Sequence, residues 1–338
     1  MLKRTLVFQS AGHLSLSDKQ LCFNTRKGTE EIKRTVPIED LGIILVENPR
    51  ITITSALLQA LAVNNTIVIF CDEKHMPASF FSAMTSNEIA QKSIHAQLNV
   101  SEALKNRLWK QTVVSKIRNQ AQVLFRNGKK KAAILIHLAG KVRNGDPENI
   151  EGTAARFYFK ELAPSIDFLR DPDGVMPNAA LNYGYAVIRS AMARALTGSG
   201  LLCISGIHHH NQYNPFCLAD DIMEPYRAYV DDEVFGDSIF WNSQEITGEM
   251  KQKLLSLLSA DVMIRGMKRP LQNAMSYTSA SLVRCFMKEQ QGIDYPEFCL
   301  CPVNSQPRCG NGRRSTEYST LQKNIKSQRI WISVPYRA

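Results

Sequence analysis

Histidines and acids gather in one short stretch of the sequence, GIHHHNQYNPFCLADDIMEPYR at residues 206–227. Three consecutive histidines open this stretch, and Asp220, Asp221 and Glu224 follow them. In a strand or loop successive side chains alternate in direction, so at most one or two of the histidines can serve one site. On a helix, the spacing of the acids places Asp220 and Glu224 on one face, with Asp221 beside them. Imidazoles and carboxylates together are typical of a metal site.

A further acid, Glu151, lies in the segment PENIEG at residues 147–152. Asn149 is a candidate N-cap, which would place Glu151 in the first turn of a helix. The helix dipole favours negative charge there, so a purely structural role for Glu151 is one interpretation. The other interpretation is a metal ligand, and Gly152 would allow a ligand to approach closely.

The acids in residues 220–224 repel one another unless a cation offsets them, and Arg227 is close enough in the sequence to do so. A divalent cation would also resolve the conflict. Carboxylates with an imidazole suit Mg²⁺ or Mn²⁺ at a phosphodiester site, and the imidazole favours Mn²⁺. Zinc stays an alternative, because it prefers more histidine ligands. On residue types alone, three histidines are candidate ligands: His208, His209 and His210.

Two kinds of element must position these groups. Up to about residue 80, segments rich in β-branched and aromatic residues predict a compact β domain with one helix at residues 54–62. From about Ser86, apolar residues recur at helical spacing, and Pro225 should perturb the helix that contains it. The predicted strands are residues 5–8, 13–17, 20–24, 32–36, 42–46 and 66–70. The predicted helices are residues 101–125, 131–143, 152–162, 178–196, 222–234 and 247–258, with one or two more in 269–289.

Positive charge is concentrated in one part of the chain. The 338 residues carry a net charge of +10, and residues 101–143 hold eleven basic side chains and one acid. Residues 301–338 hold seven basic side chains and one acid. Such concentration is typical of proteins that bind the phosphate backbone of nucleic acids, because each neutralised phosphate releases counterions. A solvated helix face is the alternative interpretation of the same pattern.

The composition disfavours membrane and secreted proteins. No apolar run approaches the ~18 residues that span a bilayer, and the N-terminal MLKRTLVFQS is not typical of a signal peptide. We therefore expect a cytoplasmic protein that does not span a membrane. The eight cysteines include no CxxC pair, so a disulfide framework is not predicted. Cys299, Cys301 and Cys309 lack a fourth ligand at the spacing of a zinc knuckle.

Four segments of the sequence resemble a known protein family. ENIEGTAARFYF (148–159), LNYGYAVIRSAMARAL (181–196) and, most specifically, GIHHHNQYNPFCLADDIMEPYRAYVD (206–231) resemble the CRISPR-associated adaptation integrase, the universal spacer-acquisition protein, in its type II form. VIFCDEKHMPAS (68–79) adds to the resemblance, which extends from about residue 1 to Leu300. The remaining residues do not match what the family shows.

The resemblance implies an α+β fold. Residues 1–82 would form a small β-rich dimerisation domain, and residues 83–300 a larger all-α catalytic domain that depends on a metal. Residues 301–338 are expected to be a disordered basic extension, since this segment is polar and rich in helix and strand breakers.

The resemblance also implies three residues that are both metal ligands and catalytic: Glu151, His209 and Glu224. The family histidine lies fifteen residues before the glutamate of the D-x-x-E-P motif, and counting back from Glu224 selects His209. Asp221 matches an acidic position near the metal in other branches of the family, and we treat it as support only. The sequence leaves three further roles open: those of Asp220, His208 and His210.

The implied function is that of a metal-dependent DNA integrase and endonuclease, using Mg²⁺ or Mn²⁺. It would insert short foreign DNA fragments into a CRISPR array as new spacers, by 3′-hydroxyl transesterification, in antiviral defence. The implied partners are a second copy of the chain, a small CRISPR-associated protein, prespacer and repeat DNA, and the RNA-guided effector nuclease for fragment selection. Two alternatives are a non-catalytic DNA-binding scaffold of the same complex and a zinc hydrolase that acts on a small molecule.

Overall fold

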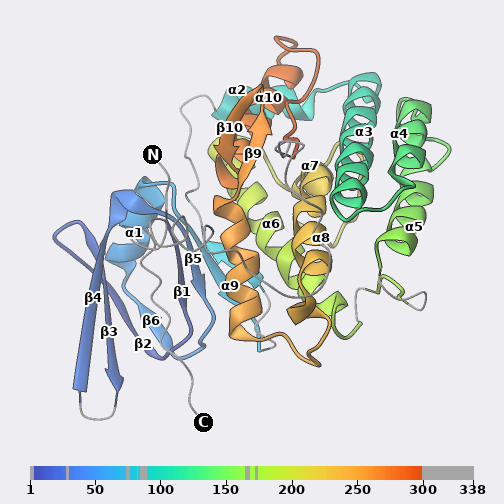
Figure 1. Ribbon diagram of the computed structural model, residues 1–338. Helices are drawn as coiled ribbons and strands as arrows, with labels where there is room; N and C mark the ends of the chain where they lie inside the picture. Colours follow the sequence, from blue (N-terminus) through green and yellow to red (C-terminus); the bar gives the residue numbers. More distant parts are fainter. Residues whose placement is uncertain are drawn as a thin grey trace. The chain divides into compact units, whose positions relative to one another are not determined.

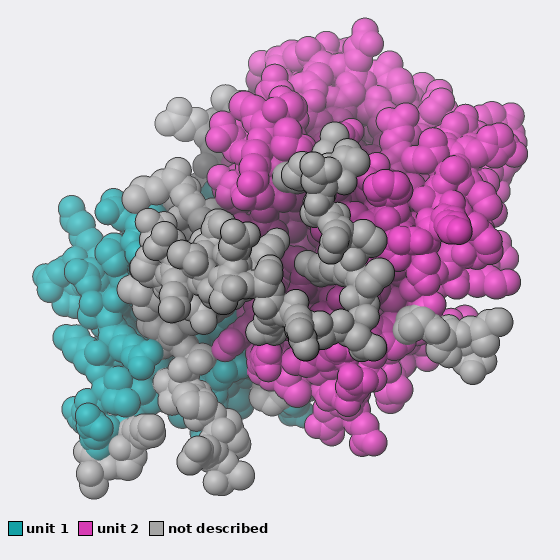
Figure 2. Space-filling view, viewed as in Figure 1, with its two compact units in different colours: residues 1, 3–82, 302–338 teal, residues 2, 83–301 magenta. Residues whose placement is uncertain are grey.

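The computed structural model describes residues 4–27, 30–73, 77–81, 83, 90–163, 168–171 and 174–298. These residues form two compact units, which meet in the sequence between Ser82 and Ala83 (Figure 2). No helix among them is both long and apolar enough to cross a membrane. The predicted basic extension at 301–338 and the three cysteines near its start lie outside the described residues.

The first unit contains a mixed sheet in the order β1-β5-β7-β8, of which Figure 1 labels β1 and β5. Its first three strands run parallel, and β8 joins antiparallel to β7. All six residues of β5, LGIILV, are buried, as expected for a central parallel strand that is covered on both faces. The strands are β1 (Arg4–Phe8), β5 (Leu41–Val46), β7 (Ile67–Cys71) and β8 (Pro77–Phe81).

A second sheet of the same unit has the order β4-β3-β2-β6. Its first three strands form an antiparallel meander, and the short β6 pairs in parallel with β2. Helix α1 begins after Thr54, whose side chain accepts a hydrogen bond from the N–H of Leu57. Leu57 belongs to the same buried core as Phe8 and Phe23. The elements are β2 (Gly12–Ser17), β3 (Gln20–Lys27), β4 (Glu30–Pro37), η1 (Ile38–Asp40), β6 (Ile51–Ile53) and α1 (Ser55–Val63).

The second unit is built around helix α6 (Asn178–Gly198), which is buried on nearly all sides. It packs against α7, α8, α9 and α10, and Gly184 lets α8 approach because a Cβ there would collide with Val230. Burial around the whole helix marks the centre of a large helical unit. The other helices are α2 (Ala90–Leu98), α3 (Glu102–Arg126), α4 (Ala132–Lys141), α5 (Ile150–Leu162), α7 (Cys217–Met223), η2 (Glu224–Tyr226), α8 (Arg227–Gly236), η3 (Ser238–Phe240), α9 (Gly248–Ser256), η4 (Leu257–Ser259) and α10 (Leu271–Phe286).

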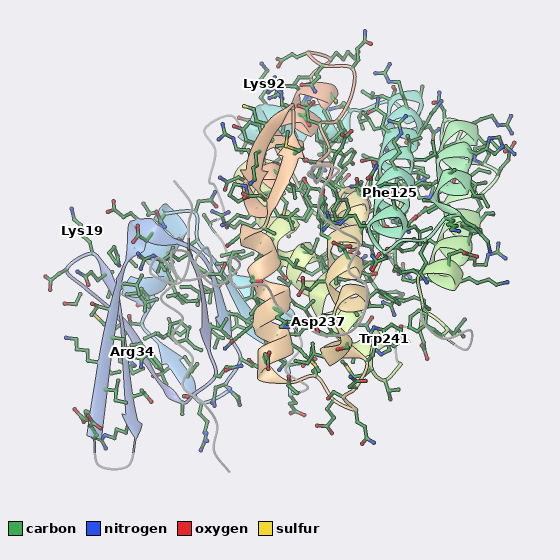
Figure 3. All side chains as sticks on the ribbon, in the orientation of Figure 1. Lys19, Arg34, Lys92, Phe125, Asp237 and Trp241 are labelled. Atoms are coloured by element: carbon green, nitrogen blue, oxygen red, sulfur yellow. The ribbon has the colours of Figure 1, made fainter. Side chains whose placement is uncertain are left out.

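Helix α3 lies beside α4 and α5 and also contacts η2, α7 and α8 (Figure 1). Near its C-terminal end Phe125 is 74% exposed (Figure 3). The helix therefore has one face in the interior and another that is open to solvent. The apolar positions whose spacing predicted this helix are all buried: Leu104, Leu108, Val113, Ile117, Ala121 and Leu124.

The predicted α+β class is confirmed, with two differences in the helical unit. Strands β9 (Asp261–Ile264) and β10 (Met267–Pro270) form an antiparallel hairpin, so this unit is not purely helical. The prediction of one continuous helix over 222–234 was wrong, since the chain forms α7, the 3-10 turn η2 and α8 instead. Pro225 accounts for the break, because it has no N–H to donate to the preceding turn.

Candidate active site

Glu151 lies in the first turn of α5, and two side chains fix the start of that helix. Asp146 accepts hydrogen bonds from the N–H groups of Ile150, at 3.0 Å, and of Glu151, at 2.9 Å. Asn149 has a left-handed backbone with φ of 50°, and its Oδ1 accepts from the N–H of Gly152 at 3.0 Å. Asn149 is thus the N-cap, as predicted. Together, Asp146 and Asn149 fix the backbone of the first turn and so the position of Glu151.

Glu224 lies at the break between α7 and α8, where its side chain is only 7% exposed. Helix α3 holds this break through Asn119, a buried residue. The Asn119 amide donates to the carbonyl oxygen of Pro225 at 2.9 Å and to that of Pro296 at 3.1 Å. The break that Pro225 causes is therefore tied to the neighbouring helix, which positions Glu224.

Lys116 of α3 joins the two acids. Its Nζ lies 2.5 Å from Oε1 of Glu151 and 2.6 Å from Oε2 of Glu224. Arg227 approaches the other oxygen of Glu224, with 3.0 Å between its Nε and Oε1. Lys116 therefore contacts both carboxylates at once, and no other described residue donates a hydrogen bond to Oε2 of Glu224.

The charges of this cluster shift each other's ionisation. Burial alone would lower the pKa of Lys116, but the carboxylates of Glu224 and Glu151 outweigh it and raise that pKa. Burial alone would raise the pKa of Glu224, and the charges of Arg227 and Lys116 lower it instead. Lys116 is therefore a cation and Glu224 an anion over the whole physiological range of pH.

His209 is oriented by Asp221, which is fully buried. Nδ1 of His209 lies 2.5 Å from Oδ1 of Asp221. The same carboxylate accepts hydrogen bonds from the backbone N–H groups of Ile207, at 2.7 Å, and His208, at 2.9 Å. The hydrogen bond between the side chains of His209 and Asp221 is the largest cause that raises the pKa of His209, and the charges of Glu224 and Glu151 add to it. With Nδ1 committed to Asp221, Nε2 is the ring nitrogen left to face a ligand.

Two other residues of the motif, His208 and Asp220, make different contacts. The ring of His208 stacks on Trp109 of α3, 4.1 Å between centroids, whereas His209 meets the same indole edge-on. The rings of His208 and His209 are nearly perpendicular, which agrees with the expectation that the histidines cannot all serve one site. Asp220 pairs with Arg189 at 2.7 Å instead of facing the carboxylates around Lys116.

The structure brings Glu151 and Glu224 together on Lys116, but it does not gather all three predicted ligands around one point. Among the described residues, no group of three histidine, cysteine or acidic side chains is arranged so that it could hold a metal ion. The charges of Glu224 and Glu151 nevertheless contribute to the raised pKa of His209. Lys116 is the feature that sequence reasoning missed, since it counted this residue only as one basic charge among eleven.

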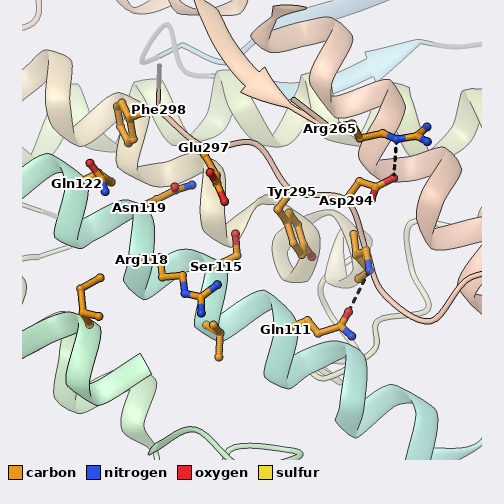
Figure 4. Close-up of a pocket in the computed structure, with 13 residues that line it drawn as sticks. Gln111, Ser115, Arg118, Asn119, Gln122, Arg265, Asp294, Tyr295, Glu297 and Phe298 are labelled. Atoms are coloured by element: carbon orange, nitrogen blue, oxygen red, sulfur yellow. Dashed lines mark hydrogen bonds and ion pairs between the residues drawn. The ribbon is translucent and has the colours of Figure 1, made fainter. Parts of the chain in front are cut away.

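A separate cavity of 490 Å³ lies along another side of α3 (Figure 4). Its lining includes Arg118 and Gln122 of α3 and Tyr295 and Glu297 from the segment after α10. None of the three predicted ligands lines it. Asn119, which lines the cavity, connects it to the break at Glu224 through its hydrogen bonds to Pro225 and Pro296.

Comparison with known proteins identifies relatives in both sequence and fold. The sequence model of the family described as CRISPR associated protein Cas1 matches residues 5–253. A CRISPR-associated endonuclease Cas1 from Neisseria meningitidis serogroup C (strain 8013) is 38% identical over 268 residues, which cover 78% of this chain and 86% of that protein.

Two solved structures share the fold. A casposase bound to integration product superposes with a TM-score of 0.70 at 16% identity, covering 97% of this chain and 99% of that one. A chain of a Cas6-RT-Cas1--Cas2 complex superposes with a TM-score of 0.64 at 18% identity, covering 86% of this chain and 35% of that one. The family match over most of the sequence and the identity to the Neisseria protein show that this chain belongs to the CRISPR-associated Cas1 family, which confirms the family predicted from its motifs.

Proposed function

We propose that this chain is a metal-dependent DNA integrase and endonuclease, which inserts short foreign DNA fragments into a CRISPR array as new spacers. The observation that carries the proposal is the convergence of Glu151 and Glu224, from two separate elements, on one cation, the Lys116 ammonium. Oxygen ligands from two carboxylates are what Mg²⁺ and Mn²⁺ prefer. The relative named an endonuclease and the casposase bound to integration product support the same reaction class.

By the chemistry of their donor atoms, Glu151, His209 and Glu224 suit a Mg²⁺ or Mn²⁺ ion, which they would hold once their side chains converge on it. Oε2 of Glu224 is a buried oxygen that contacts only an ammonium among the described residues, and Nδ1 of His209 is already bonded to Asp221. Two carboxylates with one imidazole suit these ions better than Zn²⁺, which prefers more nitrogen and sulfur ligands. When bound, such an ion supplies Lewis acidity at the target phosphate.

Other residues of the chain would prepare the reacting groups. Asp221 keeps the proton of His209 on Nδ1, which leaves the lone pair of Nε2 available. Arg227 holds the second oxygen of Glu224. In strand transfer, the 3′-hydroxyl oxygen of the incoming fragment bonds to the target phosphorus, and the 3′ oxygen of the cleaved repeat strand leaves with the proton. Water in place of that hydroxyl gives hydrolysis, and neither route needs a covalent protein–DNA intermediate.

The partners follow from the same proposal. The basic side chains of residues 101–143 would bind the phosphate backbone of the prespacer and the repeat. The β-rich unit would form the homodimer. The small partner protein would correspond to the Cas2 of the related complex. The RNA-guided effector nuclease would take part in the choice of fragments.

A non-catalytic DNA-binding scaffold is the second candidate, and one observation favours it. Lys116 and Arg227 already neutralise Glu151 and Glu224 within the protein, as expected of a structural ion-pair cluster. A scaffold would bind DNA equally well in EDTA and would show no strand transfer. Metal titration of both activities therefore separates the two candidates.

Strand transfer of a prespacer into a plasmid that carries the repeat tests the proposal, with the partner protein and Mn²⁺ present. We expect Glu151→Gln and His209→Ala to lower the rate by at least roughly 100-fold, or about 2.7 kcal/mol in activation free energy. Glu148→Gln is the matched control, since Glu148 pairs with Arg143 on the surface near the same helix. Wild-type rates in both Glu151→Gln and His209→Ala would show that these residues are not the catalytic site. Full activity in EDTA would show that the reaction does not need a metal.

A further inference from the structure

Lys116 is a largely buried lysine whose ammonium forms ion pairs with two acids. Its side chain is 12% exposed, and its ammonium contacts Glu151 and Glu224. Lysines are rarely this buried unless they are paired. The two contacts place a monovalent cation between the carboxylates that we propose as ligands of a divalent one.

The charges around this point are balanced in the structure. Glu151 and Glu224 carry two negative charges, and Lys116 and Arg227 carry two positive ones. The two bases approach different oxygens of Glu224, Lys116 at Oε2 and Arg227 at Oε1. Among the described residues, Lys116 is the one cation that contacts both acids, so it occupies the space that a bridging ion needs.

A divalent ion and the ammonium cannot both remain in that space. At a separation of about 4 Å, two positive charges repel each other strongly near a protein surface, and a doubly charged ion repels an ammonium more strongly still. Contact distances of 2.5 and 2.6 Å to the two carboxylates leave no room for a second cation between them. One cation must therefore leave before the other can bind both acids.

We propose that Lys116 is a resident counter-cation, which holds Glu151 and Glu224 together in the metal-free protein and is displaced when the divalent metal binds. This inference rests on the proposed metal site. A lysine suits the exchange because its ammonium is a compact charge on a flexible stem, whereas a guanidinium is a rigid fork. The exchange keeps the buried carboxylates paired in both states, which avoids the cost of unpaired buried charge.

The exchange makes Lys116 a competitor of the metal, and this determines whether its removal strengthens or weakens metal binding. Loss of the ammonium should strengthen metal binding and weaken the fold of the metal-free protein. A lysine that only supports the site would act in the opposite sense, because its loss would let Glu151 and Glu224 move apart and would weaken metal binding.

Calorimetric titration of the full-length protein with Mn²⁺ at about pH 8, where carboxylates are ionised, tests the proposal. Lys116→Met removes the charge and keeps most of the stem, and we expect its Kd for Mn²⁺ to fall about tenfold. Its Tm in EDTA should be lower than that of the wild type, and its rise in Tm on adding Mn²⁺ should be larger. Lys116→Arg should raise the Kd, because a guanidinium pairs with carboxylates through two bonds.

Lys110→Met is the matched control, since Lys110 lies on α3 and forms no ion pair with any described residue. Its Kd should equal that of the wild type. An unchanged or higher Kd in Lys116→Met would overturn the proposal, and so would a lower Kd in Lys116→Arg if the Met variant does not fold. Failure of the metal site itself gives a different result, because the wild type would then show no Mn²⁺ binding that depends on Glu151 and Glu224.

Discussion

A single buried carboxylate, Asp221, organises the loop that carries the histidines. It accepts N–H groups from successive residues of that loop and also bonds Nδ1 of His209. Gly206 is packed so closely against this carboxylate that a Cβ there would collide with it. In the proposed site Asp221 would therefore act through His209, as a positioning residue.

A second buried acid, Asp231 of α8, should make stability depend on pH. It accepts hydrogen bonds from the hydroxyls of Tyr158, at 3.0 Å, and Tyr185, and burial outweighs these bonds and raises its pKa from 3.8 to about 6. Between those values the folded state binds more protons than the unfolded state, so the free energy of unfolding falls as pH rises from about 4 to about 6. Two pKa units correspond to roughly 3 kcal/mol, an upper bound for the loss.

Urea unfolding at several values of pH checks this contribution. The Asp231→Asn variant has no carboxyl group to ionise at this position, so its free energy of unfolding should not fall between about pH 4 and about pH 6 on this account. The amide can still form hydrogen bonds with both tyrosines. Tyr158→Phe should keep the fall and extend it to higher pH, because the lost hydrogen bond had lowered the pKa of Asp231, and it should lower stability by about 1 kcal/mol. An identical dependence on pH in the wild type and in Asp231→Asn would contradict the assignment.

At the scale of the elements, the start of α5 couples stability to the position of Glu151. Asp146 accepts two N–H groups of the first turn, including that of Glu151, and has a left-handed backbone. Asp146→Asn keeps the preference for that backbone but loses one acceptor and the charge at the helix start. We expect a loss of about 1 kcal/mol in the free energy of unfolding and a roughly tenfold slower strand transfer.

Denaturant unfolding and the strand-transfer assay measure the two effects. Glu148→Gln again provides the comparison, because its exposed pair with Arg143 should be worth less than ~1 kcal/mol. If Asp146→Asn loses stability but transfers at the wild-type rate, then the cap supports only the helix and does not position Glu151.

The same helix shows what the sequence could predict. Asn149 and Glu151 lie within one turn, so the cap and the place of the acid follow from local chemistry. Helix α2 was not predicted, because its buried positions are Ser93 and Gln97 and not apolar residues. The Gln97 amide bonds the carbonyl groups of Leu202 and Ser205, contacts that no local pattern reveals.

Lys116 escaped prediction for a related reason. It lies at helical spacing from three buried polar residues of α3, which form one face of that helix: Thr112, Asn119 and Gln120. This polar face was the available signal, since an interior face of that kind must satisfy its groups with distant partners. Its partners, Glu151 and Glu224, come from α5 and η2, and only the packing of α3 against both elements brings them together.

At the scale of the whole molecule, the basic segment is less positive than its composition suggests. Several of its side chains pair with acids, some of them from other elements: Lys105 with Glu102, Arg126 with Asp232, Lys131 with Glu161 and Arg143 with Glu148. Lys116 pairs with both Glu151 and Glu224. Lys129 and Lys130, in the turn between α3 and α4, form no ion pair with any described residue. These two lysines remain fully available to phosphates.

The salt dependence of DNA binding should therefore separate unpaired from paired charges. For Lys129→Gln/Lys130→Gln, the slope of log K against log salt should become shallower by about 2, since each phosphate contact contributes about 0.9. For Arg126→Gln/Lys131→Gln, which removes the same number of charges, the slope should change by less than about half as much, because both are held by acids. Fluorescence anisotropy of a labelled prespacer between about 50 and 200 mM salt measures both slopes. Equal changes of slope in the two variants would mean that the ion pairs break when DNA binds. The number of basic residues alone would then predict the salt dependence.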